Sequence, residues 1–295
     1  MTKVRTTEKA PDGSLSTHNG FSLISNEKLL EIYSTMLKCR MLEERIHELS
    51  QRGKSAAKTT RTSVHAAAIA GSSIDLVPGD TLAASQGALA PCFVKGLSLA
   101  AIFAIVQPNG SAPRPKYSAA NVIPPSFSSS KQIARALAAA AACKAKKNKK
   151  VVVVFLNDAS GTSGELEDAM KIAGKKKLPV LFVCETKSHD DGRLMRAKEY
   201  GVPAVAAEDD DAVAIYRVAT ESLAHARRGN GPTLIECRPW PFNDRRQGKR
   251  APAMHPIRKM ETYLAGKGLF NKKLKSRFTA EFKRELDAAS KSAAR

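Results

Sequence analysis

The segment 151–188, VVVVFLNDASGTSGELEDAMKIAGKKKLPVLFVCETKS, constrains the fold most strongly. Val151–Leu156 is an unbroken apolar run, Glu165–Gly174 has a helical pattern, and Pro179–Cys184 is a second apolar run. Strands that are apolar on both faces are typical of parallel sheets covered by helices on both sides. The segment therefore predicts a right-handed βαβ crossover whose two strands are neighbours in the sheet.

Strand and helix patterns continue to alternate along the rest of the chain. After the crossover we expect a helix around Arg193–Tyr200, a strand at Pro203–Val205, a helix at Asp211–Ala226 and a strand at Pro232–Cys237. Further helices are expected at 26–52 with Asn26 as the cap, at Val64–Ile74, Leu97–Val106, Lys131–Ala145, Pro256–Gly266 and Lys272–Ala289. The segment 109–130 is rich in Pro, Ser and Gly and is expected to be irregular. These patterns predict an α/β fold with a mostly parallel sheet, built from one domain at 23–295 that ends in helices and is preceded by a flexible tail at 1–22.

Charge suggests partners but does not select one. The chain has 48 Lys and Arg against 28 Asp and Glu, a net charge of +20, and runs of basic residues lie at 144–150, 175–177 and 245–250. Such runs are most often solvated faces, although an acidic protein is a candidate partner. Aromatic residues make up only 5% and no specific RNA or DNA motif is present, so nucleic acid is expected to bind only non-specifically.

Apolar stretches and cysteines exclude several classes of protein. No apolar stretch approaches the length of a membrane span and the N-terminus has no signal-type apolar core, so we expect a cytoplasmic protein without a membrane partner. The five cysteines show no spacing typical of zinc sites, so neither a structural zinc nor a disulfide framework is expected. Cys184 and Cys237 lie in strand patterns, where a thiol usually acts as a small apolar residue.

Charged residues stand where the two strands of the crossover end. Asp158 follows the first strand and Lys187 follows the second. The carboxyl ends of neighbouring parallel strands are where ligands bind in open α/β sheets. A carboxylate there suits a hard cation that carries phosphates. An ammonium would instead neutralise Asp158, with an attraction of about 4 kcal/mol at roughly 4 Å and an effective dielectric of about 20, before desolvation.

These residues, with segments elsewhere, resemble a known family. The crossover is similar to the thiamine-diphosphate motif of the α subunits of 2-oxo acid dehydrogenase E1 components, of the pyruvate and branched-chain type. That family has Gly-Asp-Gly, a Gly-x-x-x-Glu-Ala helix start, Leu-Pro-Val and Glu-Asn-Asn, and this chain has NDA at 157–159, GELEDA at 164–169, LPV at 178–180 and ETK at 185–187. LLEIYSTMLKCRMLEERIHELSQRGK, VPGDT…KGLSLAAIFA, AKEYGVPAV…GPTLIECR and HPIRKMETYLAGKGLF also resemble family segments in order, so most of 25–290 is covered. The resemblance implies the thiamine-diphosphate-binding fold and a β-like partner subunit in a heterotetramer, or a homo-oligomer.

The family's magnesium ligands fall on a set of residues that has changed. By resemblance, the family's aspartate corresponds to Asp158, its second asparagine to Lys187 and its backbone carbonyl ligand to His189. Lysine has three donors and no acceptor, so Lys187 cannot ligate a cation. The plain alternatives are that Asp158 caps the following helix, that Lys187 points into solvent and that His189 is an ordinary polar residue.

Residues that serve two other functions in the family are also replaced at the corresponding positions of this chain. The diphosphate-binding Tyr-Arg-x-His falls on QGAL at 86–89, which removes an arginine that would hold phosphate oxygens. A family histidine that transfers protons falls near Phe242, which cannot do so and more plausibly packs or forms an interface, and no catalytic residue is predicted. The implied remnant cofactor site consists of Gln86, Gly87, Asn157, Asp158, Ala159, Ser160 and Lys187, with Asp158 and His189 at metal-ligand positions.

Three functions follow as hypotheses. The first is an E1 α-like subunit in which magnesium and thiamine diphosphate binding has been lost, so that the chain is non-catalytic or dependent on a partner. The second is an active thiamine-diphosphate-dependent decarboxylating dehydrogenase of 2-oxo acids, in which Lys187 contacts a phosphate as a point charge. The third is a basic protein associated with nucleic acid. The ancestral 2-oxo acid, the identity of the partner and the role of the +20 charge are left open by the sequence.

Overall fold

The computed structural model describes residues 24–51, 66–85, 88–106, 116–126, 128–157, 163–186, 190–238 and 255–293, so the tail expected at 1–22 lies outside the described residues. Ten α-helices, one short 3₁₀ helix and six strands are found in these ranges. They are α1 (Asn26–Gln51), α2 (Ala66–Ser73), β1 (Thr81–Ser85), α3 (Ala90–Val94), α4 (Leu99–Val106), η1 (Tyr117–Ala120), β2 (Val122–Ser126), α5 (Ser129–Ala145), β3 (Val152–Asn157), α6 (Ser163–Lys175), β4 (Val180–Glu185), α7 (Gly192–Glu199), β5 (Ala204–Glu208), α8 (Ala212–Arg227), β6 (Thr233–Arg238), α9 (Pro256–Gly266) and α10 (Lys272–Ala293).

The six described strands form one parallel sheet in the order β2-β1-β3-β4-β6-β5. The predicted crossover is confirmed, because β3 and β4 are neighbours and pair in register from Val152 with Val180 to Asn157 with Glu185. Since all strands run in the same direction, their carboxyl ends lie at one edge of the sheet.

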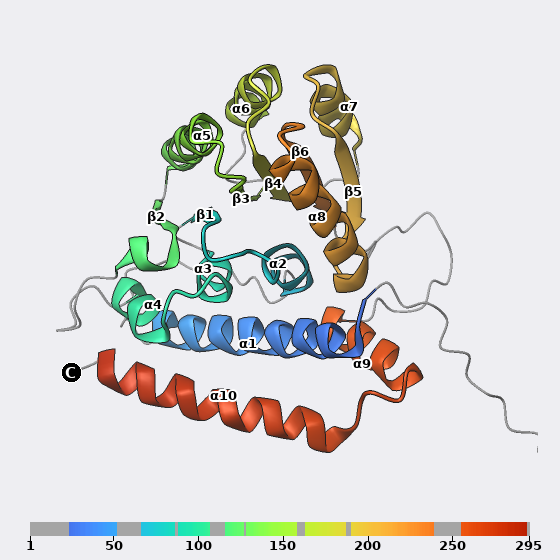
Figure 1. The fold of residues 1–295 in the computed structure, drawn as a ribbon. Coiled ribbons are helices and arrows are strands. Elements are labelled where there is room, and N and C mark those ends of the chain that lie inside the picture. Colours follow the sequence, from blue (N-terminus) through green and yellow to red (C-terminus); the bar gives the residue numbers. More distant parts are fainter. Residues whose placement is uncertain are drawn as a thin grey trace, which may run out of the picture.

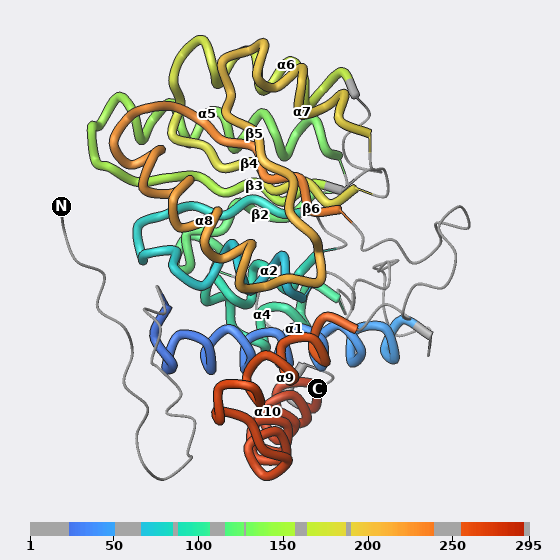
Figure 2. Tube along the Cα trace, turned by 90° about the vertical axis from the view of Figure 1, so that its right-hand side faces the viewer, coloured from blue at the N-terminus to red at the C-terminus, as the bar shows by residue number. Residues whose placement is uncertain are grey.

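Helices cover both faces of the sheet, as predicted (Figure 1). Helices α5, α6 and α7 lie on one face, while α2 and α8 lie on the other, and the long α1 packs beyond them next to α9 and α10. Figure 2 shows the same order of layers from the side. Side chains of β3 alternate between two cores, which explains why residues Val152 to Leu156 are all apolar. Val152 and Val154 enter the core under α5 and α6, whereas Val153 enters the core on the opposite face.

Small side chains let α2 sit between the sheet and α1. All eight residues of this helix are buried, and it packs against both α1 and α8. A Cβ added at Gly71 would lie 2.8 Å from Cγ2 of Ile215, so glycine is needed for the close approach of α2 to α8. The apolar stripe of α1 faces this layer, with Leu29, Tyr33 and Leu42 buried.

The prediction of an irregular segment at 109–130 is wrong for part of its length. The described portion contains η1 and β2, and α5 already begins at Ser129. Strand β2 has the sequence VIPPS and lies at the edge of the sheet beside β1. Proline lacks a donor but is tolerated on an edge strand, where one side of the backbone makes no ladder bonds. Strand β1, TLAAS, and the five-residue α3 were not predicted, because neither has enough local periodicity.

The expectation that Cys184 and Cys237 act as buried apolar residues is confirmed. Cys184 and Cys237 are buried in β4 and β6 and, like Cys39 and Cys92, are free thiols, whereas Cys143 is partly exposed. Of the helices in the described ranges, none combines the length and apolarity that crossing a bilayer requires.

Candidate functional site at the carboxyl edge of the sheet

The predicted site residues follow three strands that are adjacent in the sheet. Strands β1, β3 and β4 are consecutive neighbours, and their last described residues are Ser85, Asn157 and Glu185 or the adjoining Thr186. Of the predicted set, only Asn157 lies within the described residues, and it pairs with Glu185. Gln86, Gly87, Asp158, Ala159, Ser160, Lys187 and His189 lie outside the described residues, as does Phe242, so their assignments remain predictions.

Both flanks of the segment 187–189 are anchored to β6. On the near side, Thr186 is buried and its backbone N–H donates to the carbonyl of Cys237 at 3.0 Å. On the far side, Arg238 donates to the carbonyl of Asp190 at 3.2 Å and to the Asp191 carboxylate at 2.8 Å. Four residue steps from Thr186 to Asp190 span at most about 14 Å of extended chain. Lys187 follows Thr186 directly in the sequence, at the start of this span.

A buried carboxylate organises these anchors. Glu236 of β6 is only 1% exposed, and it accepts hydrogen bonds from Nη1 of Arg193 at 3.3 Å and from Nε of Arg238 at 2.9 Å. Two arginines offset the cost of burying this carboxylate. The arrangement ties α7 and the loop before it to the end of β6, so the backbone next to the predicted site is fixed by charge pairs.

A second group of acids gathers at the same edge. Burial raises the pKa of Glu185 well above its usual value, and the nearby Glu43 and Asp209 raise it further. Both carboxylate oxygens of Glu43, on α1, are buried, and Asp209, just after β5, is 2% exposed. The pKa of the Cys237 thiol is also raised well above its usual value by burial, with Glu185 among the acids that add to the shift. Burial and the neighbouring acids therefore favour the protonated, neutral form of Glu185, whereas a cation placed beside it would favour the ionised form.

This acidic group does not amount to a metal site in the described residues. Within the ranges that the structure describes, no three His, Cys, Asp or Glu side chains are arranged so that they could hold a metal ion. Sequence reasoning missed Glu43 and Asp209. Glu43 stands three residues before the buried Ile46 on the apolar side of α1, and Asp209 belongs to the run EDDD at 208–211 that ends β5. Two sequence signals could have identified these residues as candidates. One is an acid within an apolar stripe, and the other is a cluster of acids at the end of a strand.

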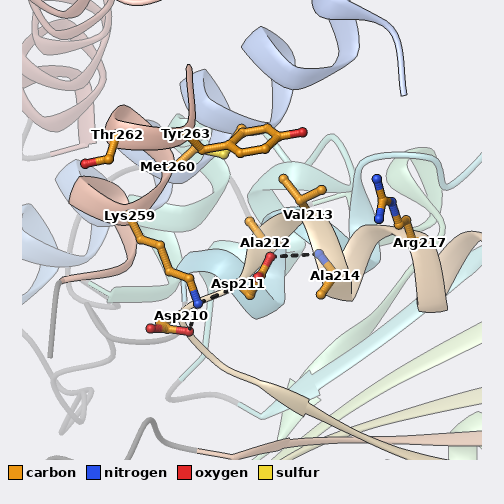
Figure 3. Close-up of a pocket in the computed structure, with 10 residues that line it drawn as sticks. All are labelled: Asp210, Asp211, Ala212, Val213, Ala214, Arg217, Lys259, Met260, Thr262 and Tyr263. Carbon is orange, nitrogen blue, oxygen red and sulfur yellow. Dashed lines mark hydrogen bonds and ion pairs between the residues drawn. The ribbon is translucent and has the colours of Figure 1, made fainter. Parts of the chain in front are cut away.

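The turn from β5 to α8 carries a further acidic group that is neutralised (Figure 3). Lys259 of α9 reaches Oδ1 of Asp210 at 2.7 Å, and it lies 3.6 Å from a carboxylate oxygen of Asp211. Asp211 also caps α8 by accepting from the backbone N–H of Ala214 at 2.9 Å. Beside this group a pocket of about 400 Å³ opens between α8 and α9, with Tyr263 at its wall. Lys259 thus neutralises acids that directly follow the end of a strand.

Comparison with solved structures defines the class of fold. A transketolase from Campylobacter jejuni superposes with a TM-score of 0.51 at 18% sequence identity, over 90% of this chain and 49% of the transketolase chain. At this level of identity the likeness concerns the fold alone, and the α/β fold predicted from the sequence is confirmed.

Residues 33–295 match the family described as "Dehydrogenase E1 component", and the chain belongs to this family. The α subunit of acetoin:2,6-dichlorophenolindophenol oxidoreductase from Bacillus subtilis is 26% identical over 242 residues, which are 76% of this chain and 72% of the relative. The α subunit of 3-methyl-2-oxobutanoate dehydrogenase from Mycobacterium tuberculosis (strain H37Rv) is 26% identical over 183 residues, 54% of this chain and 50% of the relative. A mitochondrial 2-oxoisovalerate dehydrogenase α subunit from Arabidopsis thaliana is 22% identical over an alignment of 311 positions, which covers 93% of this chain and 65% of the relative. The resemblance to E1 α subunits is thereby confirmed.

Proposed function

We propose that this chain is an E1 α-type subunit that does not hold magnesium and thiamine diphosphate unaided, and that it acts as a non-catalytic or partner-dependent subunit. The observation that carries the proposal is the ammonium of Lys187, which stands two residues after Glu185 where the family has an amide ligand to the metal. The pairing of Asn157 with Glu185 supports it, because the chain leaves β3 and β4 side by side toward the two ligand positions.

The electrostatics of the carboxyl edge favour an internal cation over a bound one. Glu185 lies one residue before Thr186 and two before Lys187, in an environment where burial and neighbouring acids disfavour its ionised form. An ammonium in this field neutralises Asp158 or Glu185 without binding a metal, as Lys259 neutralises Asp210 nearby. A magnesium ion would have to displace that ammonium and would gain no ligand from it.

The residues present also do not fit the diphosphate. At the family's phosphate-binding position Gln86 and Gly87 offer no positive charge to the phosphate oxygens. Phe242 cannot transfer a proton. We therefore derive no catalytic step through the cofactor.

A β-type subunit is the partner that the proposal implies. The relatives are named as α subunits of oxidoreductases and dehydrogenases, and each such name refers to a multisubunit enzyme. Affinity purification from the native host should recover this chain with a β-type subunit, in a complex of the size of a heterotetramer. Recovery as a monomer would count against the partner-dependent role.

The names of the relatives favour a second candidate, an active dehydrogenase with an unusual site. In that case Lys187 would contact a phosphate directly. The two candidates differ in one measurable property, which is whether the isolated chain binds the cofactor.

Restoration of the family residues tests the proposal. Thermal unfolding is measured with and without magnesium and thiamine diphosphate for the natural chain, for a Gln86→Tyr/Gly87→Arg/Lys187→Asn variant, and for a Lys198→Asn control on the exposed face of α7. We expect cofactor to stabilise only the triple variant, by about 2.7 kcal/mol when the ligand is present at about 100 times Kd. Stabilisation of the natural chain would support the active enzyme, and failure of the triple variant to respond would refute the assignment of the loss to these positions.

A further inference from the structure

A second hollow lies at the opposite, amino edge of the sheet, away from the family's cofactor position. It has a volume of about 340 Å³ and is formed where α5, α6 and α8 end and the chain turns back toward the sheet. Pro179 precedes β4 and Ala226 belongs to the last turn of α8, and both line it. A volume of this order suits a small molecule.

The lining of this pocket, which we call the basic pocket, is dominated by cations. Seven of its eleven lining residues are Lys or Arg, and none is acidic. Two of the seven are engaged: Arg227 forms a two-pronged pair with Asp80, and Lys144 donates to the carbonyl of Lys176. The other five form no ion pair with any described residue, and they are Lys147, Lys149, Lys150, Lys177 and Arg228.

Asp80, an acid next to this pocket, is already saturated with hydrogen bonds. Asp80 accepts from the backbone N–H of Val77 and of Val151, each at 3.0 Å, in addition to the two bonds from Arg227. It therefore offers no free acceptor to the five cations. The partial negative charge at the carboxyl ends of α5, α6 and α8 offsets some of their mutual repulsion, but it supplies no formal anion.

We propose that the basic pocket binds a small molecule through a diphosphate or triphosphate group. The lysine ammonium is a point charge with three donors, which suits phosphate oxygens approached from several directions. A carboxylate-bearing peptide would instead favour the planar fork of an arginine; the fork of Arg227 is occupied by Asp80, and four of the five other cations are lysines, with Arg228 the fifth.

The shape of the pocket distinguishes this ligand from a nucleic acid. A nucleic-acid strand needs an extended basic track, with aromatic side chains on which unpaired bases stack. Here the cations converge on one concave site, and no aromatic residue is among the described residues that line it. All five free cations are exposed, so an anion reaches them without a large cost in desolvation.

Inorganic tripolyphosphate is a suitable probe, titrated calorimetrically into the full chain at low salt. The test variant is Lys149→Gln/Lys177→Gln, which removes two of the free cations. The matched control is Lys272→Gln/Lys283→Gln, which removes the same charge from exposed positions on α10. We expect tripolyphosphate to bind the natural chain, the pocket variant to bind at least tenfold more weakly, and the control to stay within twofold, with unchanged circular dichroism in all three.

Each other result overturns the proposal. Equal weakening in the two variants would show that affinity reflects the diffuse net charge. Unchanged affinity in the pocket variant would place the probe elsewhere, including the family's cofactor position. A twelve-nucleotide single strand that binds more tightly than tripolyphosphate, and is lost with the same two lysines, would replace the small ligand with nucleic acid.

Discussion

The Asp80–Arg227 pair is the interaction whose loss should be most costly to the fold. Asp80 is fully buried just before β1, and its two carboxylate oxygens accept from Arg227 at 2.8 and 2.5 Å. The same carboxylate accepts from the backbone N–H of Val77 and from that of Val151, next to the start of β3. One side chain thus joins β1, β3 and the end of α8. We predict that Asp80→Asn destabilises the protein severely.

The size of the destabilisation depends on which hydrogen bonds the asparagine amide keeps. Asparagine keeps an oxygen that can accept from Val151, but its NH₂ group faces donors on Val77 and Arg227. Breaking a buried ion pair costs about 3–5 kcal/mol. The Arg227 side chain is 26% exposed, so water relieves part of its loss, and we expect about 2–4 kcal/mol. A loss of this size is a large part of the roughly 5–15 kcal/mol that stabilises a typical domain.

Urea unfolding at pH 7, followed by circular dichroism, measures the effect. The exposed Arg40–Glu44 pair on α1 is the control, because Glu44→Gln should cost no more than about 0.5 kcal/mol. A double-mutant cycle with Arg227→Gln should give a coupling energy of about 2 kcal/mol between the two side chains. A loss below about 1 kcal/mol for Asp80→Asn, or one equal to that of Glu44→Gln, would refute the reasoning.

Three further predictions concern burial. Because the pKa of Glu185 is raised in the folded state, the folded protein holds this proton more tightly, and the resulting stabilisation is lost as pH rises from the ordinary value of 4.5 through the raised pKa. The unfolding temperature of Glu185→Gln relative to the natural chain should therefore increase between pH 5 and pH 8. A constant difference in unfolding temperature would contradict this. In α6, a Cβ at Gly174 would lie 2.1 Å from the carbonyl oxygen of Tyr200, so Gly174→Ala should lower the free energy of unfolding by about 1–3 kcal/mol. Gly266→Ala has open space and should leave the free energy of unfolding equal or raise it by up to about 1 kcal/mol. Changes of the same sign for the two variants in urea unfolding would contradict the prediction. Thiol titration of the native protein at pH 8 should modify Cys143 first, because the other four cysteines are buried. Cys143 should react no faster than a free thiol, because partial burial raises its pKa. Rapid modification of more than one cysteine would contradict the described packing.

The sequence predicts those parts of the fold in which one segment carries the whole signal. Residues Val152 to Leu156 of β3 are all apolar because successive side chains enter cores on opposite faces, and this is visible without knowledge of the neighbours. Strands β1 and β2 carry little local signal. Their sequences TLAAS and VIPPS become strands because they pair with one another and because β1 also pairs with β3, which is a tertiary effect.

The candidate site divides in the same way. Lys187 and Asp158 could be singled out because they immediately follow strands that the pattern predicts. The convergence of Glu43 with Glu185 and Asp209 could not be predicted, because the three lie on α1, β4 and the turn after β5, more than 20 residues apart in sequence from one another. The basic pocket is likewise formed by three separate helix ends, although its lysine runs were evident as charge.

Titration calorimetry of the isolated natural chain with thiamine diphosphate and magnesium tests the central claim most directly. With an ammonium in place of a metal ligand, we predict no saturable heat at cofactor concentrations up to about 1 mM, corresponding to a binding free energy weaker than about 4 kcal/mol. A magnesium-dependent isotherm with a Kd below about 100 μM, or about 5.5 kcal/mol, would contradict the claim and establish a working cofactor site.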